Sequence, residues 1–406
     1  MLDLIRNILF AVLPWLAVIT VVVVVHELGH FLVARAFGVA VDRFSLGFGK
    51  TLFSFRDKGG VEWRVGALPF GGYVKFSGDA DASSSVPDAD DLADLRQQIV
   101  ARQGAEAVSR YFHFKPLWQR ALVVLGGPTA NFVLAVVVFA GILMTFGEPY
   151  ISPVIDRVGP GTAAARAGFQ PGDVITRMNG HPVDNFLYVH DYVAYHVERP
   201  ITFFVERGGR TVVLSATPTA TMQADEVFGR PMQVGVLGVG HANLKGAIPF
   251  RRLNLPHALV GGADRVYSTV AVTVRYVQRI FQGRESGNQL GGPIRIALTT
   301  KVIAQAGAAN GTTFGEHSMG VAYGLISLVG FISVSIGFMN LLPVPMLDGG
   351  HLLFYAYEAV ARRPLTAQIQ AFSYRVGLAL VVGLMLFATW NDLHLPVLKI
   401  LGGHVS

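Results

Sequence analysis

Long apolar stretches alternate with polar segments along this chain. Four of them reach the roughly 20 residues that a helix needs to cross a bilayer. They cover approximately residues 8–39, 117–146, 319–342 and 372–390. The first is too long for the apolar core of a signal peptide, and no small-residue cleavage site follows it. The pattern therefore predicts an α-helical multi-pass membrane protein with about four transmembrane helices.

The polar segments between these stretches differ in character. Residues 151–239 alternate short β-branched runs with Gly, Pro and Asn turns, which is typical of a small β-rich domain. Residues 79–106 are rich in Asp, Ser, Ala and Gln, and predict a flexible or partly helical insert.

Residues 251–281 place apolar side chains at helical spacing among several arginines. Such a basic amphipathic helix either lies on a membrane surface or packs on the β-rich domain, and the sequence does not choose between the two. The expected parts are an N-terminal membrane part, a β-rich domain, a linker with the amphipathic helix, and a C-terminal membrane part. Their boundaries are 1–150, 151–240, 241–317 and 318–406.

Composition agrees with a membrane protein, because only 15% of the residues are charged, against about 25% in soluble domains. The chain has no cysteine, which excludes disulfides, thiolate metal sites and a cysteine nucleophile. The net charge is +6, but no basic run interleaved with aromatic residues suggests a nucleic-acid partner. Lys and Arg gather in the loops after the first and third spans. The positive-inside rule places these loops in the cytoplasm, and both termini and the β-rich domain outside.

The first span contains the sequence His26-Glu27-Leu28-Gly29-His30. On a helix, His26 and His30 lie one turn apart on the same face, so both imidazoles can bind one zinc ion. Glu27 then lies beside the metal and can accept a proton from water. Three ionisable residues in an apolar span are costly and therefore indicate function.

A catalytic zinc site usually has three protein ligands, and Asp348 is the candidate for the third. It follows the third span, after Pro343 and Pro345 have interrupted the helix. The broken backbone must be satisfied by protein or water, which favours a cavity. Two alternatives remain open: Asp348 only caps the next helix, or His351 is the ligand.

Together these features resemble the site-2 protease family of intramembrane metalloproteases, in particular its bacterial RseP-like branch. The resemblance covers nearly the whole chain. It is carried by HELGH at residues 26–30, GALPFGGYVK at 66–75, GGPTAN at 126–131, LGGPI at 290–294 and NLLPVPMLDGGH at 340–351.

The resemblance implies one Zn²⁺ per chain, bound by His26, His30 and Asp348, with Glu27 as the general base. Asn340 would hold the substrate or the transition state, since its amide can donate to a developing oxyanion.

Neighbouring polar residues receive lesser roles. An interhelical hydrogen bond is the alternative for Asn340. The interhelical hydrogen bond is the stronger interpretation for Asn131, which is left out of the catalytic set. His351 would be a neighbour of the site and not a ligand.

Residues 158–180 resemble part of a PDZ domain. The best-known RseP-like enzymes carry two such domains, and this chain has room for one. The domain would bind a peptide by strand addition or act as a size filter over the active site.

A transmembrane substrate must be unwound before cleavage, and its freed backbone then needs new hydrogen-bond partners. Residues 61–75 predict a hairpin that dips towards the membrane beside the metal. Its edge at Gly71, Gly72, Tyr73 and Val74 would bind substrate by strand addition. The alternative is an ordinary cytoplasmic hairpin that only braces the first span.

The resemblance therefore implies an intramembrane zinc metalloprotease in the bacterial inner membrane. The PDZ-like domain would lie on the periplasmic side, and the active site towards the cytoplasm. The resemblance implies single-span substrates, such as anti-sigma factors already cut by a site-1 protease, or signal-peptide remnants. Two alternatives belong to other classes: a non-catalytic membrane scaffold that gathers partners, and a transporter with Glu27 and Asp348 as proton sites.

Overall fold

The computed structural model describes residues 2–78, 89–224, 231–241, 249–282, 295–296, 299–300 and 314–394. The motif at 290–294 and parts of the predicted insert and linker lie outside these residues. The chain divides into two compact units. The first combines Met1–Ile142 with Leu255–Ser406, and the second is Leu143–Asn254.

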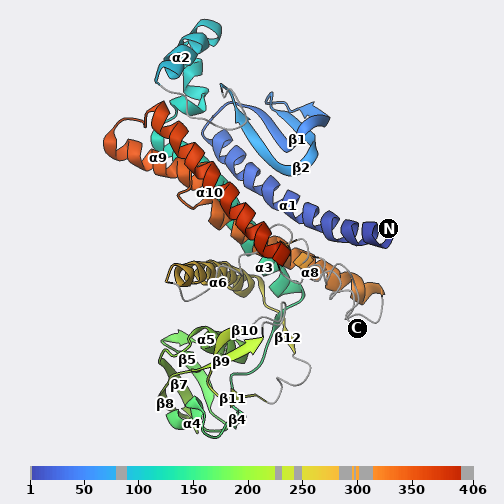
Figure 1. Cartoon of the computed structure of the whole chain (residues 1–406), viewed down its shortest axis with the longest axis vertical. Coiled ribbons are helices and arrows are strands. Elements are labelled where there is room, and N and C mark those ends of the chain that lie inside the picture. The colour runs from blue at the N-terminus through green and yellow to red at the C-terminus, as the bar shows by residue number, and fades with distance from the viewer. Residues whose placement is uncertain are drawn as a thin grey trace. The chain divides into compact units, whose positions relative to one another are not determined.

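Helices dominate the first unit (Figure 1). Its α-helices include α1 (Leu2–Ala36), α2 (Ala89–Gln103), α3 (Leu117–Thr145), α6 (Leu255–Phe281), α8 (Phe314–Asn340), α9 (Asp348–Ala361) and α10 (Ala367–His394), and two short 3-10 helices, Ala105–Arg110 and Phe112–Phe114, precede α3. Among the described helices, four are long and apolar enough to cross a membrane, as the sequence predicts. These stretches are Val12–Ala36, Leu117–Thr145, Ser318–Asn340 and Gln368–Asp392.

A sheet of two long strands, β1 (Val41–Arg56) and β2 (Glu62–Phe76), follows α1 and lies beside it (Figure 1). Both strands bend, so that Phe44 of β1 is opposite Val74 and also opposite Trp63. The predicted hairpin is present, but β1 and β2 form it, and residues 62–75, expected to contain both strands, belong to β2 alone. Local alternation of side chains identifies a strand, but it does not identify the strand's partner.

The sheet is fixed to α1 by an aromatic cluster. The Phe31 ring of α1 lies 5.7 Å from the Phe44 ring and 5.4 Å from the Trp63 ring, both edge to face. Phe44 is 1% exposed. Such pairs add about 0.5–1.5 kcal/mol each beyond their buried area, so β2 has a defined position against the helix that carries His26.

Helix α6 packs against α3. A Cβ atom on Gly262 would lie 2.7 Å from the Val136 carbonyl oxygen, so the two backbones approach closely. The Arg265 guanidinium lies 5.9 Å from the centre of the Phe139 ring. Tyr267 and Val260 of α6 remain exposed. The helix is therefore amphipathic, with one face on the membrane helices of its own unit.

The second unit is small and β-rich. Its four-stranded sheet has the order β6 (His181–Pro182), β5 (Val174–Met178), β7 (Ile201–Arg207), β8 (Arg210–Ala216). The short helices are α4 (Ala163–Ala167) and α5 (Phe186–Tyr195). The remaining short strands are β3 (Glu148–Pro149), β4 (Arg157–Val158), β9 (Thr219–Ala224), β10 (Pro231–Val236), β11 (Val239–Gly240) and β12 (Phe250–Arg251).

One ion pair stands out in this unit. The Asp173 side chain is inaccessible to solvent and accepts hydrogen bonds from Arg207 Nε and Nη2 at 2.7 and 2.8 Å. Burial by itself would raise the pKa of Asp173, but the bonds from Arg207 and the Gln170 amide lower it below its usual value. The pair connects β7 to the loop before β5.

Candidate metal centre and active site

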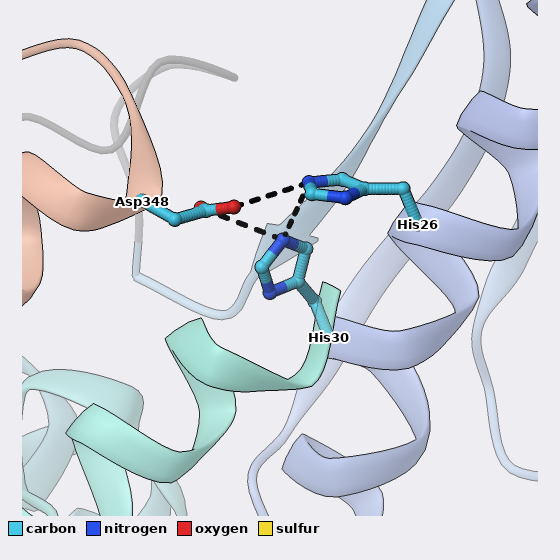
Figure 2. Close-up of side chains that lie close together, drawn as sticks. All are labelled: His26, His30 and Asp348. Carbon is cyan, nitrogen blue, oxygen red and sulfur yellow. Dashed lines mark hydrogen bonds and ion pairs between the residues drawn. The ribbon is translucent and has the colours of Figure 1, made fainter. Parts of the chain in front are cut away.

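Three side chains from distant parts of the chain meet at one point (Figure 2). His26 and His30 project from α1, and Asp348 is the first residue of α9. The His26 Nε2 atom lies 3.2 Å from His30 Nε2 and 3.2 Å from Asp348 Oδ2. His30 Nε2 lies 3.5 Å from Asp348 Oδ1. The structure thus brings together the three residues that the sequence predicts as ligands.

This donor set fits a zinc ion. Two imidazole nitrogens and a carboxylate converge, and such groups are usual ligands of catalytic zinc. Asp348 Oδ2 is buried and makes no hydrogen bond with any described residue, although it lies 3.2 Å from His26 Nε2. An orphaned buried carboxylate oxygen beside two imidazole nitrogens is best satisfied by a cation.

The chain turns sharply between α8 and α9 to deliver Asp348. Met346 adopts a φ of 91°, which is rare for a residue with a side chain. The cap of α9 is Leu347, and no side chain among the described residues makes a capping hydrogen bond there. Asp348 therefore does not cap the helix with its carboxylate. A Cβ atom on Gly349 would lie 2.2 Å from the Leu342 carbonyl oxygen, so this tight turn requires glycine.

Helix α3 supports the histidines from behind. His30 Nδ1 lies 2.9 Å from the Val123 carbonyl oxygen, and His26 Nδ1 lies 3.2 Å from Asn131 Nδ2. The helices can approach this closely because Gly29 of α1 faces Gly126 of α3. A Cβ atom on Gly29 would lie only 2.2 Å from the Gly126 carbonyl oxygen. A partner on the second ring nitrogen fixes the orientation of a metal-binding histidine.

A cavity of about 380 Å³ opens on the three ligands. It is also lined by Glu27, by Asn340 at the end of α8, and by a stretch of β2, namely Gly71, Gly72, Tyr73 and Val74. Asn340 Nδ2 lies 3.2 Å from His26 Nε2. All the residues predicted for catalysis and substrate binding thus face the same space.

Glu27 lies between the ligands and β2. A Cβ atom on Gly72 would lie 3.2 Å from Glu27 Cγ, and Val74 lines the same cavity as Glu27. His351 lines the cavity but is not in the ligand cluster. Its ring centre lies 6.0 Å from that of Tyr374.

The partners of two supporting interactions were not predicted from the sequence. Asn131 contacts another helix, as its interhelical alternative predicted, but the partner is the metal ligand His26. Arg120 of α3 pairs with Glu358 of α9 at 2.6 Å and lies over the Tyr355 ring. A polar residue inside a span is a general sign of function, and this sign was available for Asn131. Nothing in the sequence pairs Arg120 with Glu358.

Comparison with known proteins agrees with this site. The sequence model of peptidase family M50 matches residues 14–384. The metalloprotease MmpA of Caulobacter vibrioides is 48% identical over 394 residues, which cover 96% of each chain. Two further relatives are named as zinc metalloproteases and are each 38% identical. The one from Agrobacterium fabrum is matched over 94% of this chain and 95% of its own, and the one from Rhizobium meliloti over 96% and 98%.

The family match runs from the first membrane-length helix to the last, and its range includes every residue of the ligand cluster and its cavity. The family and the relatives' names support a protease, and not the scaffold or the transporter that the sequence left as alternatives. Zinc is the cofactor that the ligand set and the relatives have in common. The chain belongs to peptidase family M50, the site-2 protease family, and is an integral membrane zinc metalloprotease.

Proposed function

We propose that this enzyme hydrolyses peptide bonds within or near the membrane-spanning segments of single-span proteins, including signal-peptide remnants. The observation that carries the proposal is the depth of the ligand cluster. His26 lies ten residues before the end of the apolar stretch Val12–Ala36, about 15 Å along the helix axis. That distance is about half the thickness of the hydrocarbon core.

The chemistry divides among residues that face the cavity. When bound, zinc would polarise the scissile carbonyl and lower the pKa of water to about 7. Glu27 takes the proton of the attacking water and passes it to the leaving amine. Asn340 donates its amide N–H to the oxygen on which charge develops. The position of Asn340, 3.2 Å from His26 Nε2, supports this role.

Strand addition on β2 would hold the substrate in an extended form. The segment from Gly72 to Phe76 pairs with β1 along one edge, and among the described residues no strand pairs with its other edge. The same segment lines the cavity beside Glu27. An unwound substrate can thus replace its lost helical hydrogen bonds at the point of cleavage.

The remaining parts of the proposal concern selection and location. The β-rich second unit acts as a PDZ-like filter on the periplasmic side of the bacterial inner membrane, and the active site faces the cytoplasmic side. The lipid bilayer surrounds the four apolar helices. Substrates of regulated intramembrane proteolysis, such as anti-sigma factors, arrive after a first cut by a site-1 protease. Lys and Arg in the loops after the first and third spans support this orientation.

Incubation of the purified full-length protein in detergent with a panel of model single-span substrates tests the proposal. Cleavage sites are mapped by mass spectrometry, with and without a zinc chelator, and Glu27→Gln is the matched control. We expect chelator-sensitive cuts inside or at the edge of the apolar segment. Cleavage confined to soluble, unstructured peptides would contradict an intramembrane role.

A further inference from the structure

Asn131 lies in the middle of α3, inside a membrane-length helix, and is 0% exposed. Its Nδ2 atom is 3.2 Å from His26 Nδ1, whereas its Oδ1 atom has no hydrogen-bond partner among the residues that the structure describes. Its backbone carbonyl oxygen accepts a hydrogen bond of 2.8 Å from the Ser333 hydroxyl of α8. A buried amide with one unsatisfied atom is costly, so this residue calls for a reason beyond filling space.

The tautomer that His26 needs in order to bind a metal supplies that reason. The Nε2 atom of His26 faces the other two ligands, so it must present a lone pair to a metal. A neutral imidazole then carries its proton on Nδ1. This N–H needs an acceptor, and an amide nitrogen cannot be one. Rotating the Asn131 carboxamide by 180° exchanges two atoms of similar size and brings Oδ1 to face Nδ1, where it accepts the proton.

His30 shows the same arrangement with a different acceptor. Its Nδ1 atom lies 2.9 Å from the Val123 carbonyl oxygen, and its Nε2 atom faces Asp348. Val123 and Asn131 are two turns apart on α3. Each ligand histidine therefore has one acceptor on this helix, supplied by the backbone for His30 and by a side chain for His26.

We propose that Asn131 is a positioning residue that holds His26 in its metal-binding tautomer by accepting a hydrogen bond from Nδ1–H through Oδ1. The inference rests on the zinc site and not on the identity of the substrate. Outer partners of this kind typically change metal affinity by 10–100-fold when they are removed. Asn131 acts through His26 and does not itself contact the metal.

Two substitutions at Asn131 separate this role from simple packing. Asn131→Leu keeps a similar volume but cannot accept a hydrogen bond. Asn131→Asp keeps the acceptor and adds a charge, as in carboxylate–histidine–zinc arrangements. A residue needed only for helix packing would tolerate leucine and suffer from a buried charge. A positioning residue gives the opposite order.

The measurement is zinc affinity of the full chain in detergent, by competition with a chromophoric chelator, together with the visible absorption of the Co²⁺-loaded protein. We expect zinc affinity to fall by about 10–100-fold in Asn131→Leu, with a changed Co²⁺ spectrum. In Asn131→Asp, affinity should stay within a few-fold of the natural protein or rise. Ser333→Ala is the matched control, because it removes the neighbouring bond to the Asn131 backbone and leaves the carboxamide in place.

Neither readout depends on proteolysis, so the result is independent of the proposed substrates. An Asn131→Leu protein that binds zinc as tightly as the natural protein does would overturn the proposal. If Asn131→Leu does not fold, as judged by circular dichroism and gel filtration, Asn131→Asp decides alone. A large loss of zinc affinity in a folded Asn131→Asp would then overturn it, and retained affinity would support it.

Discussion

Replacing Gly127 by alanine should weaken zinc binding although it changes the chemical identity of no polar group in the site. Gly127 lies on the face of α3 that touches both ligand histidines. A Cβ atom there would lie 2.3 Å from His30 Nε2 and 2.8 Å from His26 Cε1. Ordinary contacts of a Cβ atom begin at 3.4 Å, so His30 Nε2 would have to move by about 1 Å, the gap left to van der Waals contact.

A zinc site does not tolerate such a movement, because metal–ligand distances hold within about 0.2 Å. Changes that only reorient a ligand cost 10–100-fold in affinity. Direct displacement of Nε2 should therefore cost about 100-fold or more. Alanine is favoured over glycine within a helix by up to about 1 kcal/mol, so loss of the fold is not the expected cause.

The assay is zinc content after dialysis against a weak chelator, with affinity from competition and unfolding followed by circular dichroism. Gly141→Ala is the matched control on the same helix, since a Cβ atom there would meet no described atom within 4 Å. It should bind one zinc with natural affinity. A Gly127→Ala protein with one zinc at natural affinity would refute the steric argument and the assigned position of His30.

Four further outcomes are expected. Glu27→Gln should keep one zinc per chain and lose cleavage by at least about 100-fold, because its amide cannot accept the water proton; substantial turnover would mean that Glu27 is not the base. Arg120→Met should lower the free energy of unfolding by about 3 kcal/mol and also lower zinc affinity, because Glu358, on the same helix as Asp348, loses its partner. The charge swap that combines Arg120→Glu with Glu358→Arg should recover part of each loss. If a double-mutant cycle shows no recovery, the pair does not couple the helices. Tyr73→Pro should still bind zinc, and its cleavage of helical substrates should fall more than its cleavage of a substrate loosened by helix-breaking residues. Tyr73→Phe is the control, and an equal loss on both substrates would exclude strand addition. Asp173→Asn should destabilise the second unit by about 2 kcal/mol at pH 7, measured by hydrogen exchange in the full chain. The pKa of Asp173 is lowered in the folded state, so its contribution to stability is present above the unfolded pKa of about 3.9 and is lost as the pH falls below that value. An effect of the substitution that does not depend on pH would contradict the ion pair.

The sequence by itself determined the parts of this protein that depend on local spacing. Apolar runs of sufficient length give the membrane-length helices. Two histidines four residues apart necessarily share a helix face, so half of the ligand cluster follows from residues 26–30 alone. Asp348 was predicted because a carboxylate after a proline-broken span needs a polar surrounding.

Only the tertiary structure decided which distant segments meet. The partner of the strand at 62–76 proved to be β1, since backbone pairing depends on geometry that alternation does not encode. The glycines at 29 and 127 are visible in the sequence, but their meaning depends on how closely α3 approaches α1. Asn131 likewise gained a role only when packing brought its carboxamide to His26. Local periodicity fixes which face a side chain occupies, whereas the group it touches across the interface is fixed by packing between helices distant in the chain.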